Sequence, residues 1–215
     1  MEQPIRQNNA PSTQPMPGQM LHGGHELFDI HELLSNTISL LDQYMMLRQL
    51  AKDPELVDMI NRQYQYISDC YNITVEALKT GRKPTHPTQV YMMKQDHTAV
   101  YGMQASQQQA QTAQSVTEIN DQKISTQMLQ LIKSSALLHT MAASETVNPV
   151  LRRMLADSVA NYLEMAYEIF LYQNKRGYYQ VPQFDRQTTE ALVNRFAPIN
   201  TAIPQNQSMG TNQTH

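Results

Sequence analysis

Histidine and carboxylate side chains gather in one short segment near the beginning of the chain. His22, His25 and His31 lie within ten positions of one another, together with Glu26 and Glu32. Imidazole and carboxylate groups at this density could bind Zn²⁺ or Ni²⁺. Because the segment also contains two consecutive glycines, we expect it to be flexible, and three exposed histidines without a function are the simpler interpretation. No metal ligand is predicted here.

Paired carboxylates elsewhere raise the question of a di-metal centre inside a helical bundle. Such a centre needs a Glu from each of two helices and a Glu-x-x-His from each of the other two. Glu164 and Glu168 share a helix face at i, i+4, but without a histidine partner we expect them to form a solvated edge. The chain contains no Glu-x-x-His: Glu76 is followed by Lys79, Glu164 by Tyr167 and Glu168 by Leu171.

The sequence also shows no group of residues arranged for nucleophilic or acid–base catalysis. Cys70 is the single cysteine, and a reactive thiol would need a base and an electropositive setting that the sequence does not show. We expect a buried structural thiol there, and a buried or boundary imidazole at His139. The chain carries no G-x-S-x-G motif, no phosphate loop and no dinucleotide fingerprint. The sequence thus predicts no catalytic, cofactor-binding or metal-ligating residue.

The composition excludes several further classes of protein. The 215 residues carry a formal net charge of −3 and a pI near 6.1, which argues against electrostatic capture of nucleic acid or anionic lipid. One cysteine excludes a disulfide framework and a cysteine-based zinc site. No apolar run approaches the roughly 18 residues that span a bilayer, and residues 1–19 lack the features of a signal peptide. We expect a protein made for the cytoplasm, or for a compartment reached without secretion.

The elements that would position these residues are helices. Apolar residues recur in steps of three and four along 26–51, as in a core helix. The main stripe is Leu27, Ile30, Leu34, Ile38, Leu41 and Met45, widened by Leu33, Leu40 and Leu47. Asp53-Pro54 then supplies an N-cap with proline in the first turn, and Gly81 is expected to end the second helix. Because the turn between the helices is very short, they must lie antiparallel.

The same hairpin is predicted a second time. Ser115 and Glu118 form a candidate capping box for a third helix, and Asn148-Pro149 repeats the cap-and-proline start for a fourth, which ends at Gly177. The stripe of the fourth helix is Leu151, Leu155, Tyr162, Met165 and Ile169. Residues 82–114 between the hairpins are polar, rich in glutamine and without a helical period. Such a segment suits a crossover that runs the length of a bundle.

Two hairpins of matched length joined by one long crossover predict an all-α fold, a ferritin-like four-helix bundle. We expect both ends of the chain to lie outside its core. The predicted organisation is a disordered N-terminal arm over 1–22, a helical hairpin over 23–81, the crossover over 82–114, a second hairpin over 115–183, a short helix within 184–196 and a disordered tail over 197–215.

The segments that carry both hairpins resemble a known family. The blocks HGGHELFDIHELLSNTISLLDQYMMLRQLAKDPEL (22–56) and NPVLRRMLADSVANYLEMAYEIFLYQNKRGYYQVPQ (148–183) are similar to the coat F family of bacterial spore coat proteins. An Asn-Pro between two helices and the Lys-x-Gly-Tyr-Tyr ending are the features most like that family's domain. The resemblance spans about 22–183, and the coat F-like proteins of Bacillus, which carry both hairpins, are the most similar members.

The resemblance implies a sporulation-associated, non-enzymatic structural protein that acts by packing or association in the spore coat. It implies a ferritin-like fold without catalytic residues or cofactor, assembled from the cytoplasm. The expected partners are other spore proteins and, as a further hypothesis, a second copy of the chain; neither nucleic acid nor membrane insertion is expected. Two alternatives stay open: a ferritin-like metal-binding or redox protein, and a helical module that binds a small molecule or a partner.

Overall fold

The computed structural model describes residues 22–104 and 111–199, and the regular structure of these residues is helical apart from isolated bridges between residues 101–102 and Val181. The helices are α1 Gly24–Leu50, α2 Pro54–Thr80, α3 Asp121–Glu145, α4 Pro149–Lys175 and α5 Arg186–Val193, with a 3-10 turn at Val116–Glu118. Most of the two predicted arms (1–21 and 200–215) and residues 105–110 of the crossover lie outside the described residues.

The predicted caps open the second and fourth helices. The Asp53 carboxylate accepts a hydrogen bond from the Glu55 backbone N–H at 2.9 Å, and the Asn148 side chain accepts from two N–H groups of the first turn of α4. Proline follows each cap, where its missing N–H leaves no helical bond unmade. Gly81 ends α2 with φ +65°, a conformation that glycine adopts without a steric penalty.

The third helix begins later than predicted. Ser115 and Glu118 bond to each other at 3.3 Å, but they close a 3-10 turn rather than a helix, and the chain then becomes extended at Ile119 and Asn120. The side chain of Asn120 accepts from the Lys123 N–H at 3.0 Å and is the cap of α3. The predicted start was wrong because a Ser–Glu pair stabilises an isolated turn as readily as a helix end.

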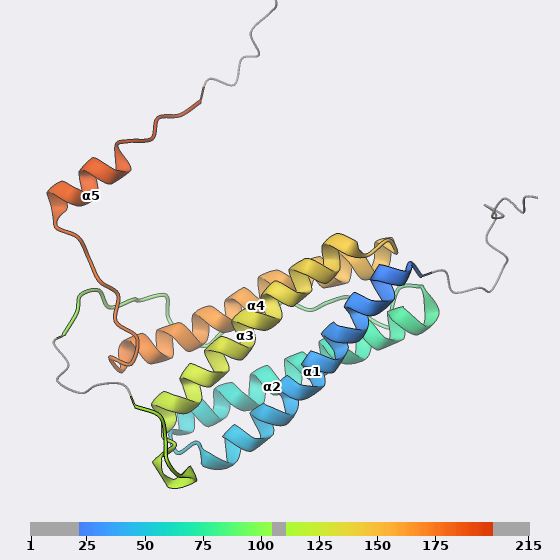
Figure 1. Cartoon of the computed structure of the whole chain (residues 1–215), viewed down its shortest axis with the longest axis horizontal. Helices are drawn as coiled ribbons and strands as arrows, with labels where there is room; N and C mark the ends of the chain where they lie inside the picture. The colour runs from blue at the N-terminus through green and yellow to red at the C-terminus, as the bar shows by residue number, and fades with distance from the viewer. Residues whose placement is uncertain (1–21, 105–110, 200–215) are drawn as a thin grey trace, which may run out of the picture.

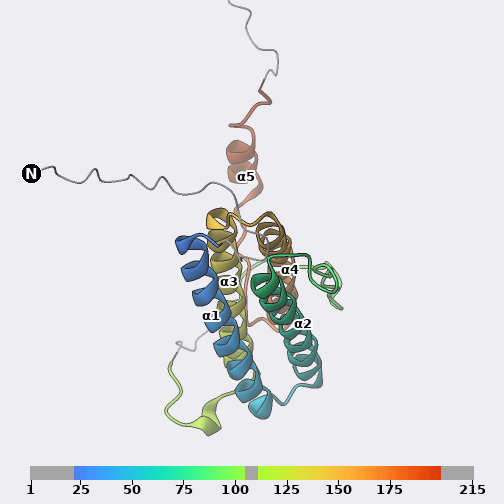
Figure 2. The same cartoon turned by 90° about the vertical axis from the view of Figure 1, so that its right-hand side faces the viewer.

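The four long helices pack side by side, each against two neighbours (Figure 1 and Figure 2). α1 and α4 both contact α2 and α3. The Lys52 N–H donates to Asp121 at 2.8 Å, which places the start of α3 beside the turn between α1 and α2. Asn148 donates to the Gly81 carbonyl at 3.3 Å at the opposite end. The crossover therefore returns along the full length of the helices, and every helix runs antiparallel to both of its neighbours.

The core confirms the stripe predicted for α4 and corrects the one predicted for α1. Of the main α1 stripe, Leu27, Ile38 and Met45 are 46%, 47% and 42% exposed. The predicted Ile30, Leu33, Leu40 and Leu47 are buried. The buried face of α1 also contains residues that were not predicted: Glu26, Thr37 and Tyr44. Because α1 is apolar on more than one side, its period alone does not select the side that the other helices cover.

The remaining segments behave differently from each other. Residues 84–95 of the crossover lie against α2 and α4 and bury Tyr91. α5 falls inside the range where a short helix was predicted, and it lies apart from the four long helices without a buried residue (Figure 1). Among the residues described, no helix has both the length and the hydrophobicity needed to cross a membrane.

Candidate functional site

A fully buried carboxylate lies at the centre of a polar cluster between α2, α4 and the crossover. Glu168 of α4 pairs with Arg62 of α2, with 2.7 Å between Oε1 and Nη2. The Tyr91 hydroxyl and the Lys94 backbone N–H of the crossover also donate to this carboxylate, the latter at 2.9 Å. A buried charge is tolerated only when it is paired and hydrogen-bonded, and Glu168 meets both conditions. We refer to Arg62, Glu168 and Tyr91 as the clamp.

The clamp is supported from both sides. Toward the core, the Gln63 amide donates to Glu168 at 3.4 Å, and Tyr44 of α1 donates to the Gln63 oxygen at 2.7 Å. Toward solvent, Asp58 accepts from Arg62 at 2.8 Å and pairs with Lys94 at 3.0 Å. These bonds join α1, α2, α4 and the crossover into one network.

Burial and hydrogen bonds shift the pKa values of several groups in and beside the clamp. Burial of Arg62 opposes its charge, but the hydrogen bonds to Glu168 and Asp58 and the nearby negative charge together outweigh this effect and raise the pKa of the guanidinium. Burial, reinforced by the bond to Glu168, raises the pKa of the Tyr91 phenol. The hydrogen bond from Arg62 lowers the pKa of the Asp58 carboxyl. The Glu168 carboxylate is thus engaged by Arg62 and by the Tyr91 hydroxyl.

A second set of bonds closes the end of the molecule where α4 finishes. Arg176 donates to Asp53 and Glu55 of α2, each at 2.6 Å, and its guanidinium lies 3.9 Å from the centre of the Tyr172 ring. The hydrogen bond from Gln95 and those from Arg176 lower the pKa of the Glu55 carboxyl. The N-cap of α2 thus doubles as the anchor for the last turn of α4.

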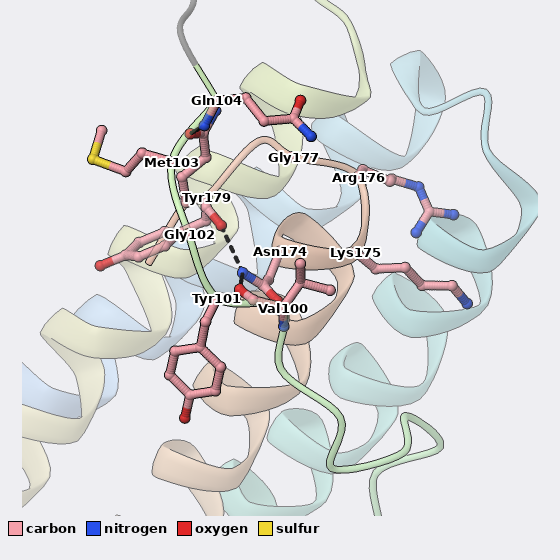
Figure 3. Close-up of a pocket in the computed structure, with 11 residues that line it drawn as sticks. Val100, Tyr101, Gly102, Met103, Gln104, Asn174, Lys175, Arg176, Gly177 and Tyr179 are labelled. Atoms are coloured by element: carbon pink, nitrogen blue, oxygen red, sulfur yellow. Dashed lines mark hydrogen bonds between the residues drawn. The ribbon is translucent and has the colours of Figure 1, made fainter. Parts of the chain in front are cut away.

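The side chain of Asn174 holds the Lys-x-Gly-Tyr-Tyr segment in place by hydrogen bonds. Its amide nitrogen donates to the carbonyls of Val100 and Tyr179, both at 2.9 Å, and its oxygen accepts from the Val100 N–H at 2.6 Å. Gly177 makes the reversal possible with φ +71°. The side chain lies between the crossover and the loop after α4, at the base of a pocket of about 400 Å³ (Figure 3). The pocket is open, and its lining combines amide groups such as Asn174 with apolar side chains such as Met103 and Tyr179.

The histidine segment at the start of α1 is partly buried, which corrects the expectation of three exposed histidines. The His22 ring lies 3.1 Å from the buried Glu26 carboxylate and 2.9 Å from the Leu78 carbonyl oxygen. The same carboxylate accepts from the Val147 N–H at 3.2 Å. His25 and His31 are exposed and do not join this cluster. These contacts tie the start of α1 to the end of α2 and to the turn between α3 and α4.

The other sequence candidates lie on α2, α3 and α4. Glu168 is buried and Glu164 half-buried, so the expected solvated edge was wrong for Glu168. Cys70 is buried, and this burial raises the pKa of its thiol to about 11. His139 is buried against Tyr162, and burial lowers the pKa of its imidazole to about 4. Within 22–104 and 111–199, no three His, Cys, Asp or Glu side chains are placed to share a metal ion.

Sequence reasoning did not find Arg62, Gln63, Tyr91 or Asn174. One signal was present: Gln63 stands between Ile60 and Ile67 on the core stripe of α2, where a polar residue must find a partner. No such signal exists for Tyr91, because the crossover has no period from which burial could be predicted.

The fold and these sites define an all-helical protein whose charged and polar side chains tie helices and crossover together. The Coat F domain model matches residues 120–182, which are α3, α4 and the ending held by Asn174. The spore coat protein F-like protein YhcQ of Bacillus subtilis (strain 168) is 53% identical over 194 residues, or 90% of this chain and 89% of that protein. The chain therefore belongs to the coat F family of spore coat proteins.

A solved structure shares the fold. The crystal structure of a candidate spore coat protein from Bacillus halodurans C-125 matches with a TM-score of 0.55, over 77% of this chain and 96% of that one. Its sequence is 14% identical to this chain. At this identity the likeness concerns the helical fold alone.

Proposed function

We propose that this protein is a structural component of the bacterial spore, assembled into the coat and acting by packing and association with other spore proteins. The observation that carries the proposal is the 53% identity with a spore coat protein F-like protein over 90% of the chain. Identity at this level over 90% of the chain preserves the fold, on which a structural protein depends.

We also propose that the protein is not an enzyme. The groups that could do chemistry are engaged or inaccessible: Glu168 is paired with Arg62, and Cys70 and His139 are buried. A nucleophile or general base must reach a substrate with its reactive atom free. The pairing and burial of these groups give no support to the alternative of a metal-binding or redox protein. Iron or manganese bound at a stoichiometric level to the purified chain would overturn this proposal.

We propose further that the four long helices form a ferritin-like bundle. The support is their connectivity, in which two hairpins are joined by a crossover that returns along the whole length. A cysteine pair made by Lys52→Cys and Asp121→Cys tests this connectivity, because the Lys52 N–H lies 2.8 Å from the Asp121 carboxylate. We expect an intramolecular disulfide. Its absence, together with cross-linking of residue 52 to the far end of α3, would contradict the proposed order.

The exposed surface supports association rather than isolation. Large apolar side chains stand exposed on several helices, for example Phe28 on α1, Leu137 on α3 and Leu163 on α4. Charged residues make up only 16% of the chain, so electrostatic repulsion between neighbouring molecules is weak. Partners are accordingly expected among other coat proteins and further copies of this chain.

Fractionation of sporulating cells and purified spores, followed by an immunoblot for this chain, tests the proposed role. We expect the protein to appear during sporulation and to resist mild extraction from the spore. Equal abundance in growing cells, or a freely soluble pool in the spore fraction, would contradict a built-in coat component. A constitutive cytosolic protein of the same strain serves as the fractionation control.

A further inference from the structure

The outer side of α1 and α2 carries an apolar groove along the line where the two helices meet. On α1, Leu27, Leu34, Ile38 and Met45 are spaced by seven, four and seven residues and lie on one side of the helix. This is the stripe that the sequence predicted to be core and that the fold leaves partly exposed. A spacing close to 3.5 residues is the one at which helices of different chains mesh side chains over a long distance.

α2 completes the groove with the same spacing. Tyr64, Tyr71 and Leu78 follow one another every seven residues and are half-buried. Tyr71 and Leu78 line a hollow of about 620 Å³ together with Leu27 and Ile38. Tyr64 lines a second hollow, of about 290 Å³, nearer the turn between the helices. We refer to these two hollows and the stripe between them as the open groove.

Nothing in the described part of the chain covers the open groove. The crossover lies beyond α2, on its side away from α1, where it contacts Arg62 and Tyr66 (Figure 2). α5 lies apart from the four long helices and has no buried residue (Figure 1). Residues 1–21 contain four prolines, at positions 4, 11, 15 and 17, so their sequence does not suit a helix that could follow the spacing of the groove.

We propose that the open groove is the interface between two copies of this chain, with α1 and α2 of one copy packed on α1 and α2 of the other across a two-fold axis. The 27 residues of α1 span about 40 Å, and two packed helices present a face about 20 Å wide. The resulting area of about 800 Å² per copy is what a stable, specific interface needs. A two-fold axis uses the same patch twice, as a self-complementary groove requires.

The stripe on α1 also sets the direction of the pairing. Along α1, Ile38 is the residue of the first hollow that stands nearest the second, so the two-fold axis passes near it. A two-fold axis across the middle of a helix makes the two copies of α1 run antiparallel.

The test is the mass of the full-length purified chain in solution, by sedimentation. We expect a dimer for the natural sequence. Ile38→Glu buries a charge at the centre of the interface and should raise the dimer dissociation constant at least about 30-fold. Leu137→Glu makes the same change at an exposed site on α3 outside the groove and should leave the constant within about threefold. Circular dichroism checks that both variants keep the helical content of the natural chain.

Oxidative cross-linking gives a second measurement of the same face. Ile38→Cys places a thiol near the proposed axis, while the native Cys70 is buried. Mild oxidation should link Ile38→Cys chains into a covalent dimer and leave Leu137→Cys chains unlinked. Equal linking of the two variants, or equal weakening of association by the two glutamates, would assign association to another surface.

Two further results would contradict the proposed interface. A natural chain that is monomeric at the concentrations used for the variants overturns the interface. If removal of residues 1–21 then makes the groove bind an apolar dye, the groove belongs to the arm of its own chain. The inference rests on the association part of the proposed function. Because it is measured on the pure protein, its failure leaves the spore location to be judged by the fractionation alone.

Discussion

The two long sides of α2 meet their surroundings in opposite ways. On one side, Arg62 and Tyr66 contact the crossover: Arg62 reaches the Tyr91 hydroxyl at 2.8 Å, and Tyr66 donates to the Gln89 carbonyl at 2.6 Å. On the other side, Tyr64 and Tyr71 border the open groove and have no segment of the described chain above them. Tyr64 and Tyr66 are two positions apart, yet one lies in the open groove and the other against the crossover.

The difference shows that covering a helix face requires a segment with matching polar groups. The crossover has no helical period, so its backbone groups must be satisfied by side chains such as Glu168, Asn161 and Asn174. Those side chains stand on α4, which borders only one side of α2. The groove between α1 and α2 is lined mainly by apolar side chains, which suit another helix better than an extended segment. One side is therefore closed within the chain, and the other is left for a partner.

Removing the arginine of the clamp should have the largest effect. Arg62→Ala leaves the Glu168 carboxylate buried without its counter-charge, which should cost about 4 kcal/mol of unfolding free energy. Urea unfolding followed by circular dichroism measures the loss. Arg153→Ala is the matched control, because Arg153 pairs with Asp157 in full exposure at 3.7 Å and should cost less than about 0.5 kcal/mol. Equal losses in the two variants would show that the clamp is no stronger than a surface ion pair.

Acidification should lower the unfolding free energy through the buried His139. Burial lowers the pKa of His139 to about 4 in the folded chain, against an ordinary value near 6.5. As pH falls from 6.5 to 4, His139 therefore becomes protonated in the unfolded chain but stays neutral in the folded chain. The unfolding free energy decreases over this pH range. The loss should reach about 3 kcal/mol at pH 4.

A variant isolates this imidazole from the carboxylates that titrate in the same range. The difference in unfolding free energy between pH 7 and pH 4 should be smaller by about 3 kcal/mol in His139→Leu than in the natural chain. An unchanged difference would mean that His139 is protonated equally in both states.

Loss of one hydroxyl should loosen the crossover without unfolding the helices. Tyr91→Phe removes the hydrogen bond donated to Glu168 and the one accepted from Arg62 and keeps the ring, at a cost of about 2 kcal/mol. Amide hydrogen exchange should rise in residues 84–95 and stay the same along α1. Exchange that rises equally in both segments would contradict a local role. Tyr64→Phe, on the other side of α2, should change neither segment.

The smallest loss of unfolding free energy is expected for a substitution in the open groove, measured on the monomeric chain. Ile38→Ala should cost less than about 1 kcal/mol when unfolding is measured at a concentration low enough to separate the copies, because this side chain is already 47% exposed. Leu40→Ala, two residues away and 1% exposed, should cost about 3 kcal/mol. Similar costs for the two would show that the groove is covered within the chain.

Much of the helical framework could be predicted from local sequence. Asp53-Pro54 and Asn148-Pro149 each place a capping side chain before a proline, and both open helices where expected. The start of α3 was misplaced by a turn, since the Ser115–Glu118 pair is equally stable outside a helix. The clamp could not be predicted, because Arg62 and Glu168 are 106 residues apart and neither position is unusual in its own helix.

The sequence by itself determined where helices form, where they reverse and that one long connection separates two hairpins, since caps, glycines and helical period act over only a few residues. It also placed the chain in its family. The tertiary structure alone decided which apolar stripe of α1 became core and which became the open groove. It also decided that Glu168 is buried and paired rather than solvated. Both choices depend on which helices and which part of the crossover come to lie against a residue, and such contacts join segments far apart in the chain.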